Sequence, residues 1–474
     1  MLRHGSFVFS ATALRSMQHD EDLLERHNHQ RRLASRRLTA SYMLKKEARS
    51  MHPQASGSGT TSTSAVPTAV CQDMVVQNAL YTGDLEKLGE LFPKGSRVNF
   101  IVDLREGDMR WVARGEGLWS LTYEQELTTP LHITAGRGFA DCLRLLLQRG
   151  ADVELAPGGG GTALHEACES CQPECVKLLL SHGADANAVS EDGLMPLHVC
   201  TLRESFECAR QLLQYGAAIN GRSVDEQDTP LHVAARSGLP EHTDLYLRYG
   251  AAVDRPNAEE LTALGAACGH PQEAHRLRFY HQVCRTLLAA GADPGALDRD
   301  KQTPLHMACK NANADAVDLL LAHGAAVNDM DYSAEAPLHK ILKVACYKLA
   351  HEPERVVRSL LNHGSTRVWP GALPLVLKHC CGSPRTIEVL LNSYHRLKVT
   401  DAWVEAVPPE VFKEHQDFYE SLFSLAGTPR SLQHLTRCSL RGILEGRVHT
   451  VVPKLPLPTA VQNYLLLQFR GYVH

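Results

Sequence analysis

The chain has 474 residues, of which 44% are hydrophobic and 22% charged, and its formal net charge is −4. This composition supplies enough apolar surface for folded cores, which argues against a disordered chain. No apolar stretch reaches the about 18 residues needed to cross a bilayer, so we expect no integral membrane segment. Eight Lys/Arg and one Glu are concentrated in residues 26–49, and the remainder is acidic. Such a distribution is not typical of a dedicated nucleic-acid binder, so we expect no nucleic-acid partner.

The chain contains fourteen cysteines, and the first residues of the chain bear on the compartment in which they would lie. Residues 1–17 lack the continuous apolar core and the small-residue cleavage site of a secretory signal, and Glu21, Asp22 and Glu25 argue against a transit peptide. Disulfide frameworks are typical of small secreted chains, so cysteines in a large chain without such a signal favour a reducing compartment. We therefore expect a cytoplasmic protein, with the nucleus also possible.

A basic arm comes first along the chain. Residues 1–52 form this arm, in which Leu33, Leu38, Met43 and Leu44 could line an amphipathic helix that docks on an acidic protein or on a membrane surface. A solvated, disordered arm is an equal alternative. Residues 53–70 are rich in Gly, Ser and Thr, which is typical of a flexible linker.

The central part of the chain repeats a motif of the form Thr-Pro-Leu-His. Its leucine stands at positions 131, 164, 197, 231, 264, 305 and 338, in steps of 33, 33, 34, 33, 41 and 33 residues. Glycines at 150, 183, 216, 250, 291, 324 and 364 keep nearly the same step. Two series with one period indicate an internal repeat.

Each repeat is predicted to contain two short helices and a connecting finger. Thr is a good N-cap and Pro fits the first helical position, while the apolar run that follows, such as residues 145–147, predicts the second helix. The glycine is the residue expected at a left-handed helix C-cap. Because one unit cannot bury both faces of its helices, neighbouring units must stack into a solenoid. We therefore predict an all-α fold.

The pattern resembles the ankyrin repeat, which has a period of 33 residues and the signature Thr-Pro-Leu-His-x-Ala. Seven repeats span residues 129–364, and degenerate units at 79–91 and 373–391 would close the stack. We expect a solenoid over residues 71–393, connecting helices over 394–427 and a helical module over 428–474. Two repeats carry insertions, residues 269–282 and 342–353, between their two helices.

Several His and Cys residues could suggest a metal. His165, Cys168, Cys171 and Cys175 have spacings that permit tetrahedral zinc binding. However, Cys168 and Cys175 fall at repeat positions that other units also fill with Cys, and buried free Cys packs as a small hydrophobe. We therefore expect no metal and no cofactor. The motif histidines, at 132, 165, 198, 232, 306 and 339, are expected to tie neighbouring backbones rather than to catalyse.

Two surfaces are candidates for binding a protein substrate. The fingers are acidic and could form a negative stripe, although solvated finger tips are the simpler interpretation. The first insertion combines basic and aromatic residues, and it could equally pack on its own solenoid. The candidate contacts are Asp225, Glu226 and Asp228 in a finger, and Arg276, Arg278, Phe279 and Tyr280 in the insertion.

The last residues depart from the repeat. We expect packing helices at 402–407 and 411–425, and then a helix that Thr428 caps, with Pro429 in its first turn. Its apolar residues fall on one face, with Arg430, Arg437 and Arg441 on others; they are Leu432, Leu435, Thr436, Leu440, Ile443 and Leu444. The prolines of residues 452–458 forbid a helix there and favour an extended path, after which Val461, Tyr464 and Leu465 resume helical spacing.

A repeat stack followed by this tail resembles the ankyrin repeat and SOCS box family. In that family the first part of the box recruits elongin C through a small residue and Leu, then Cys and an aliphatic residue. Ser431, Leu432 and Leu440 match this pattern, but Thr436 stands at the Cys position, and its hydroxyl is expected to reduce affinity. Leu435 lies in the same elongin-binding segment. The second part, Leu455, Pro456, Leu457 and Pro458, matches the motif that selects cullin-5.

The resemblance implies a non-catalytic adaptor of a ubiquitin ligase. Such a chain would bind a protein substrate on its solenoid and join elongin B, elongin C and cullin-5 with a RING subunit. The residues show no convergent nucleophile, carboxylate pair or phosphate loop, so we do not expect an enzyme. One alternative is a plain ankyrin scaffold whose tail only caps the stack. Another is a peripheral protein that binds membranes or nucleic acid through its basic arm.

Overall fold

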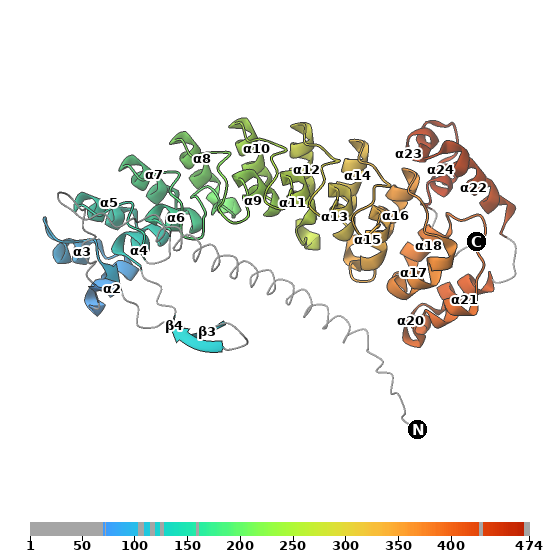
Figure 1. The fold of residues 1–474 in the computed structure, drawn as a ribbon, viewed down its shortest axis with the longest axis horizontal. Coiled ribbons are helices and arrows are strands. Elements are labelled where there is room, and N and C mark those ends of the chain that lie inside the picture. Colours follow the sequence, from blue (N-terminus) through green and yellow to red (C-terminus); the bar gives the residue numbers. More distant parts are fainter. Residues whose placement is uncertain are drawn as a thin grey trace, which may run out of the picture. The chain divides into compact units, whose positions relative to one another are not determined.

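The computed structural model describes residues 70–71, 73–102, 109–113, 119–123, 128–157, 161–425 and 430–468. These residues are mostly helical and form two compact units, Met1–Pro230 and Leu231–His474, each of which is built from successive helix pairs (Figure 1). The predicted all-α fold is confirmed, with two small sheets as exceptions. The basic arm lies outside the described residues. No helix in the described part of the chain is long and apolar enough to span a membrane.

The first unit opens with the degenerate pair, α2 and α3, whose N-caps Asp73 and Asp84 accept hydrogen bonds from the backbone of Val75 and Lys87. Two short strands pair in parallel, and a hairpin that the sequence analysis did not predict pairs β3 with β4. The elements are β1 (Val70–Cys71), α2 (Met74–Thr82), α3 (Leu85–Leu91), β2 (Ile101–Val102), β3 (Met109–Ala113), β4 (Trp119–Tyr123), α4 (Pro130–Gly136), α5 (Ala140–Gln148), α6 (Ala163–Glu169), α7 (Pro173–Ser181), η1 (Arg203–Ser205) and α8 (Phe206–Gln214).

The second unit continues the helix pairs and ends in the C-terminal helices. Its repeats contain α9 (Pro230–Arg236), α10 (Pro240–Arg248), α11 (Ala263–Gly269), η2 (Ala274–Arg276), α12 (Leu277–Ala289), α13 (Pro304–Lys310), α14 (Ala314–Ala322), α15 (Pro337–Val344), η3 (Leu349–His351), α16 (Pro353–Asn362), η4 (Pro370–Ala372), α17 (Leu373–Cys380) and α18 (Pro384–Leu391). The remaining elements are α19 (Asp401–Glu405), α20 (Pro409–Glu414), α21 (Gln416–Ser424), α22 (Leu432–Leu444), α23 (Val448–Val451), η5 (Val452–Lys454) and α24 (Thr459–Leu465).

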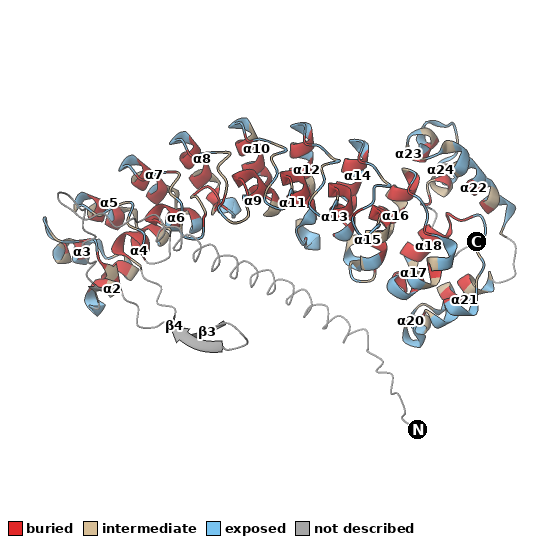
Figure 2. Ribbon diagram, in the orientation of Figure 1, coloured by how far each residue is buried: buried red, intermediate tan, exposed pale blue. Residues whose placement is uncertain are grey.

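The motif residues perform the local roles predicted for them. Thr129 and Thr303 cap their helices by accepting a hydrogen bond from the backbone three residues on. The motif histidines reach the next finger: in His132 and His306, for example, Nε2 lies 3.0 Å from a carbonyl oxygen 29 residues later. The seven glycines all adopt the left-handed conformation. Figure 2 shows that the buried residues are concentrated where the helices of the repeats face one another.

One repeat departs from the prediction. Residues 196–199 form a turn and a bend instead of the first helix, although the ring of His198 still hydrogen bonds to the Asp228 carbonyl. Met195 replaces the capping Thr, and Val199 and Thr201 are β-branched, so this segment has a weak intrinsic preference for helix. The predicted insertions lie only partly between the helices of their repeats. Residues 270–276, with η2, and 345–352, with η3, do so, whereas residues 277–282 form the start of α12 and residues 342–344 the end of α15.

The cysteines of the possible zinc set have other environments. Cys168 and Cys175 are fully buried among the helices, and burial raises the pKa of Cys175 to about 11. His165 is engaged with the Leu194 carbonyl through Nε2. These contacts agree with the packing interpretation of this run.

Candidate partner-binding site in the C-terminal helices

Helix α22 supplies the first part of the site. The helix begins at Leu432, and its N-cap is Ser431, whose hydroxyl accepts a hydrogen bond from the His434 amide across 3.2 Å. The start at Leu432 is later than the sequence indicated. Thr428 and Pro429, predicted as the cap and first turn, lie outside the described residues.

The two faces of α22 have opposite chemistry. Leu432 is 80% exposed and Ile443 71% exposed, and Thr436 and Leu440 are exposed on the same side. His434, Arg437 and Cys438 are buried on the other side. The face that a soluble helix normally buries is therefore presented outward, and the polar face points into the fold.

Buried polar residues hold α22 against the last repeat. His434 Nε2 lies 2.8 Å from the Tyr394 carbonyl, and Arg437 donates hydrogen bonds to the Asn392 carbonyl and to His434 Nδ1. This pattern fits a neutral imidazole that donates from Nε2 and accepts at Nδ1, in agreement with burial, which lowers the pKa of His434 to about 4. The Arg437 guanidinium also lies over the Tyr464 ring, 4.2 Å from its centroid. Leu432 is thus carried on a helix whose orientation is fixed.

The segment after α22 closes a small core of its own. Val448, Val452 and Leu465 are buried together, and Leu444 and Leu457 pack against them. The predicted extended path is wrong for Val452–Lys454, which form the 3-10 turn η5 because Pro is tolerated in the first turn of a helix. Extended backbone begins at Leu455, with φ −76° and ψ 142°. Leu455, Pro456 and Pro458 are exposed, whereas Leu457 is half-buried.

A mostly apolar groove separates α22 from α24. Leu432, Thr436 and Leu440 line it from α22, and Val461, Tyr464 and Leu465 line it from α24. Its volume is about 840 Å³, and its lining, which includes Leu457, contains no carboxylate. Such a surface can accept apolar side chains of another protein.

The predicted partner-binding residues do not all reach this groove. Leu432, Thr436 and Leu440 lie along it, whereas Leu435 is half-buried on the flank of α22 and Ser431 acts as the cap. The inward residues His434, Arg437 and Arg441 were missed as anchors. Their spacing of three and four residues was the signal, because it places them on one helix face.

The predicted substrate contacts differ in exposure. Tyr280 is buried and donates a hydrogen bond to the Arg236 carbonyl, so its predicted role in an exposed docking spot is wrong. Arg276 donates to the Ser237 carbonyl, and Asp228 is buried beside Ser223. Both residues stabilise the repeat stack.

The other predicted substrate contacts are more accessible. Arg278 is exposed, and its guanidinium lies over the half-buried Phe279 ring. Asp225 and Glu226 are half-buried. None of these residues adjoins the α22–α24 groove in the described structure.

Two family models match the chain. A family model described as ankyrin repeats matches residues 110–190, 184–257 and 272–367, and a model described as SOCS box matches residues 428–466. The chain is 38% identical over 468 residues to human Ankyrin repeat and SOCS box protein 16, a match that covers 99% of both chains. It is 46% identical over 399 residues to human Ankyrin repeat and SOCS box protein 18, which covers 83% of this chain and 85% of that protein.

A solved structure is also similar to part of the chain. The ankyrin repeat domain of human ASB11 is 26% identical, with a TM-score of 0.42, over 48% of this chain and 97% of that domain.

Proposed function

Because the chain belongs to the ankyrin repeat and SOCS box family, we propose that it is the substrate-recognition adaptor of a cullin-RING ubiquitin ligase. In this proposal the ankyrin repeats bind a protein substrate, and residues 428–474 join elongin B/C and cullin-5. The chain forms no covalent bond itself. A conjugating enzyme on the RING subunit transfers ubiquitin, and the adaptor contributes proximity. Such an adaptor would act in the cytoplasm or the nucleus.

The observation that carries the proposal is the outward apolar face of α22. Leu432 is 80% exposed although the polar face of the same helix is buried. An exposed leucine on a rigidly held helix stabilises nothing within the chain, and it is suited to insert into a partner. We assign elongin C to the face formed by Leu432, Thr436 and Leu440, with Ser431 and Leu435 at its border.

The extended segment after η5 supports a second contact. Leu455, Pro456 and Pro458 are exposed on a backbone that proline restricts, so little conformational entropy is lost when a partner binds. We assign cullin-5 to this segment. Leu457 would hold this segment in place, because it packs on the core formed by Val448, Val452 and Leu465.

The test is capture of elongin C from cell extract. Leu432→Asp places a charge in the proposed interface and should reduce capture at least tenfold, without lowering the melting temperature. Leu375→Asp is the matched control, since Leu375 on α17 is also exposed but lies away from the groove. Equal capture by the wild type and by Leu432→Asp would reject the proposal.

A scaffold without ligase function is the second candidate, and the buried anchors of α22 favour it. Arg437 and His434 bond to the last repeat, so the C-terminal helices also cap the stack. The scaffold hypothesis predicts that deleting residues 428–474 unfolds the last repeats and that the intact chain captures no elongin C. The adaptor hypothesis predicts capture by the intact chain.

A further inference from the structure

Successive fingers of the second unit are joined into one continuous edge. The Arg299 amide donates to the Glu259 carbonyl across 3.0 Å, and the Tyr332 amide donates to the Asp300 carbonyl across 3.1 Å. We call this surface, residues 256–260, 297–302 and 329–335 together with Trp369, the finger edge. Because the backbone fixes the spacing of the tips, the side chains on them form an ordered array.

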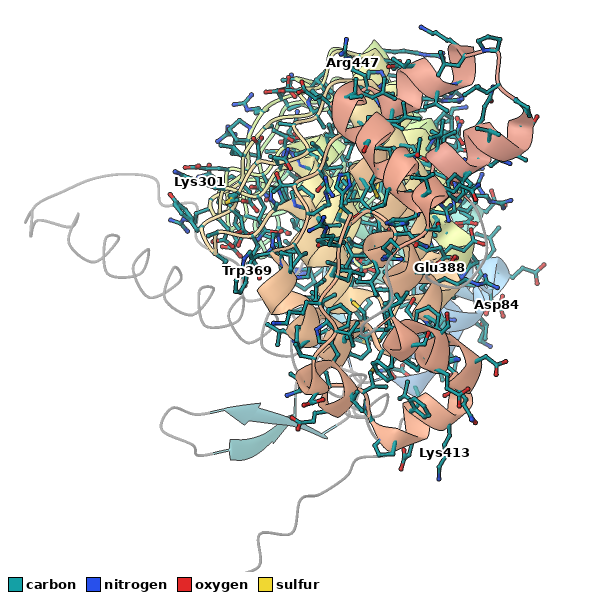
Figure 3. All side chains as sticks on the ribbon, turned by 90° about the vertical axis from the view of Figure 1, so that its right-hand side faces the viewer. Asp84, Lys301, Trp369, Glu388, Lys413 and Arg447 are labelled. Carbon is teal, nitrogen blue, oxygen red and sulfur yellow. The ribbon has the colours of Figure 1, made fainter. Side chains whose placement is uncertain are left out.

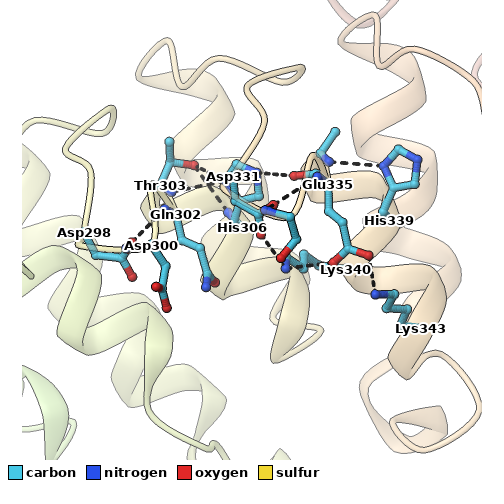
Figure 4. A network of polar contacts seen from close by, with 12 residues as sticks. Asp298, Asp300, Gln302, Thr303, His306, Asp331, Glu335, His339, Lys340 and Lys343 are labelled. Carbon is cyan, nitrogen blue, oxygen red and sulfur yellow. Dashed lines mark hydrogen bonds and ion pairs between the residues drawn. The ribbon is translucent and has the colours of Figure 1, made fainter.

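The acidic residues of the finger edge divide into two kinds. The Asp298 carboxylate accepts hydrogen bonds from the backbone of Asp300 and Gln302 and so closes its own turn. Asp331 closes the next turn in the same way, and Lys340 pairs with it across 2.6 Å. Figure 4 shows this network, from which the carboxylate of Asp300 points away. The inward carboxylates are structural.

The outward carboxylates leave a negative field at the edge. Glu259 and Asp300 are exposed on adjoining fingers. Arg299 and Lys301 are exposed beside Asp300, and Lys301 lies over the Tyr332 ring, 4.9 Å from its centroid. The finger edge nevertheless contains seven Asp and Glu residues against these two cations. Burial raises the pKa of Asp298, and the neighbouring charges of Asp300 and Glu259 act in the same direction. A cation placed here would be attracted by several carboxylates at once.

Large apolar side chains accompany these charges. Trp369 is 75% exposed and Tyr332 68% exposed, and Leu297 and Met330 are exposed on successive tips. The Trp369 ring lies against the backbone of Gly371, where an added Cβ would come within 1.9 Å of it. Lys301 and Trp369 lie along the same edge of the view in Figure 3, away from Glu388 on α18. Exposed Trp and Tyr on an ordered surface are typical of binding hot spots.

We propose that the finger edge binds a protein segment in which Lys or Arg alternates with apolar residues. The cations would pair with Glu259 and Asp300, and the apolar side chains would pack on Met330, Tyr332 and Trp369. Charge complementarity selects this occupant, because an acidic segment would be repelled by the same carboxylates. The inference rests on the proposed function and assigns the chemical class of the substrate segment.

The experiment uses the full chain and a labelled 16-residue probe peptide of repeating Arg-Leu-Lys-Tyr. Fluorescence anisotropy measures its affinity at low and high salt. Glu259→Lys with Asp300→Lys should weaken binding at least tenfold and reduce its salt dependence, and Met330→Ser with Tyr332→Ser should weaken it similarly. The matched controls, Glu405→Lys with Glu410→Lys and Leu375→Ser, change exposed residues outside the finger edge and should leave affinity unchanged.

A photo-crosslinker in the peptide should label residues 256–335 or Trp369, which locates the site independently of the variants. Equal binding of a charge-inverted Glu peptide, or unchanged affinity in both finger variants, would overturn the inference. Deletion of residues 1–52 tests the chain's own basic arm as occupant. A tenfold gain in peptide affinity on deletion would overturn the assignment to a partner. Elongin C capture is measured in parallel, so that failure at the finger edge is distinguished from failure of the adaptor proposal.

Discussion

Arg441 on α22 donates a hydrogen bond across 2.6 Å to the side-chain oxygen of Asn362, the last residue of α16. The same guanidinium donates to the backbone carbonyls of Leu361 and Leu465. Burial lowers the pKa of Arg441 to about 10, so the group remains charged at neutral pH. One side chain of α22 therefore bonds both to α16, in the seventh repeat, and to the last residue of α24.

Replacing Arg441 should loosen this module. Arg441→Met keeps the aliphatic part of the side chain but leaves three acceptors without their donor, which we expect to lower the free energy of unfolding by about 2–4 kcal/mol. Urea unfolding and trypsin cleavage near residue 430 measure the effect. Arg447→Met is the control, because Arg447 is exposed and bonds only weakly to the Leu444 carbonyl. Equal stability of the two variants would show that Arg441 is not an anchor.

The close approach of two glycines makes a second prediction about the same junction. Gly364 has φ +89°, and an added Cβ would lie 2.9 Å from the Gly446 Cα. Gly324 has nearly the same backbone conformation, with open space around it. Both Ala variants carry about 1–2 kcal/mol of left-handed strain, but only Gly364→Ala should also displace α23. Gly364→Ala should therefore have the lower urea midpoint and the faster cleavage near residue 430. Indistinguishable variants would contradict the predicted backbone contact.

Acid should destabilise the protein well above the range in which carboxylates titrate. Burial lowers the pKa of His132, His198, His242 and His434 to about 4. Above about pH 6.5 these groups are neutral in both the folded and the unfolded chain, so they do not change the free energy of unfolding. Below about pH 6.5 these histidines bind protons in the unfolded chain but stay neutral in the folded chain. The free energy of unfolding therefore falls from about pH 6.5 towards pH 4.

Urea unfolding between pH 7.5 and 4.5 tests this pH dependence. Each of these four histidines should add about one proton to the slope of the free energy of unfolding against pH. His165, His306, His351 and His363, whose pKa burial also lowers, should add to it. His434→Gln should reduce the slope by about one proton for the transition that includes the C-terminal helices. A stability that is constant or rises on acidification through this range would be inconsistent with neutral buried histidines.

The sequence predicts the repeats more completely than the site, for a physical reason. The period, caps and left-handed glycines are local properties, so Thr303, His306 and Gly324 could be assigned roles without knowing their neighbours. The orientation of α22 depends on carbonyl groups at Asn392 and Tyr394, about forty residues earlier. These acceptors become available only where α18 ends and the chain turns, and nothing in the spacing of α22 identifies them.

The insertion at residues 269–282 also depends on contacts that are distant in the sequence. Arg276 and Tyr280 form a basic–aromatic pattern that is compatible with a docking spot or with packing. Their partners are the carbonyl groups of Ser237 and Arg236, at the end of a helix in the preceding repeat. These two carbonyl groups favour packing over docking, because they accept hydrogen bonds from the Arg276 guanidinium and the Tyr280 hydroxyl.

Thr436 allows a prediction about the affinity of the chain for elongin B/C. It is exposed on the groove-lining face of α22, and its hydroxyl donates to the Leu432 carbonyl across 2.8 Å, which satisfies it within the helix. Under the adaptor proposal an apolar partner surface would cover this hydroxyl, at a desolvation penalty that Cys largely avoids. Thr436→Cys should therefore bind purified elongin B/C about three- to tenfold more tightly, by about 1 kcal/mol.

Calorimetry with the intact chain measures this gain. Thr450→Cys is the control, because Thr450 on α23 is also exposed, bonds locally to the Arg447 carbonyl and lies outside the groove. Both variants should unfold at the wild-type urea concentration, since neither hydroxyl supports a contact with another element. If Thr436→Cys binds no more tightly than Thr450→Cys, position 436 does not face elongin C, and the register assigned to α22 must shift.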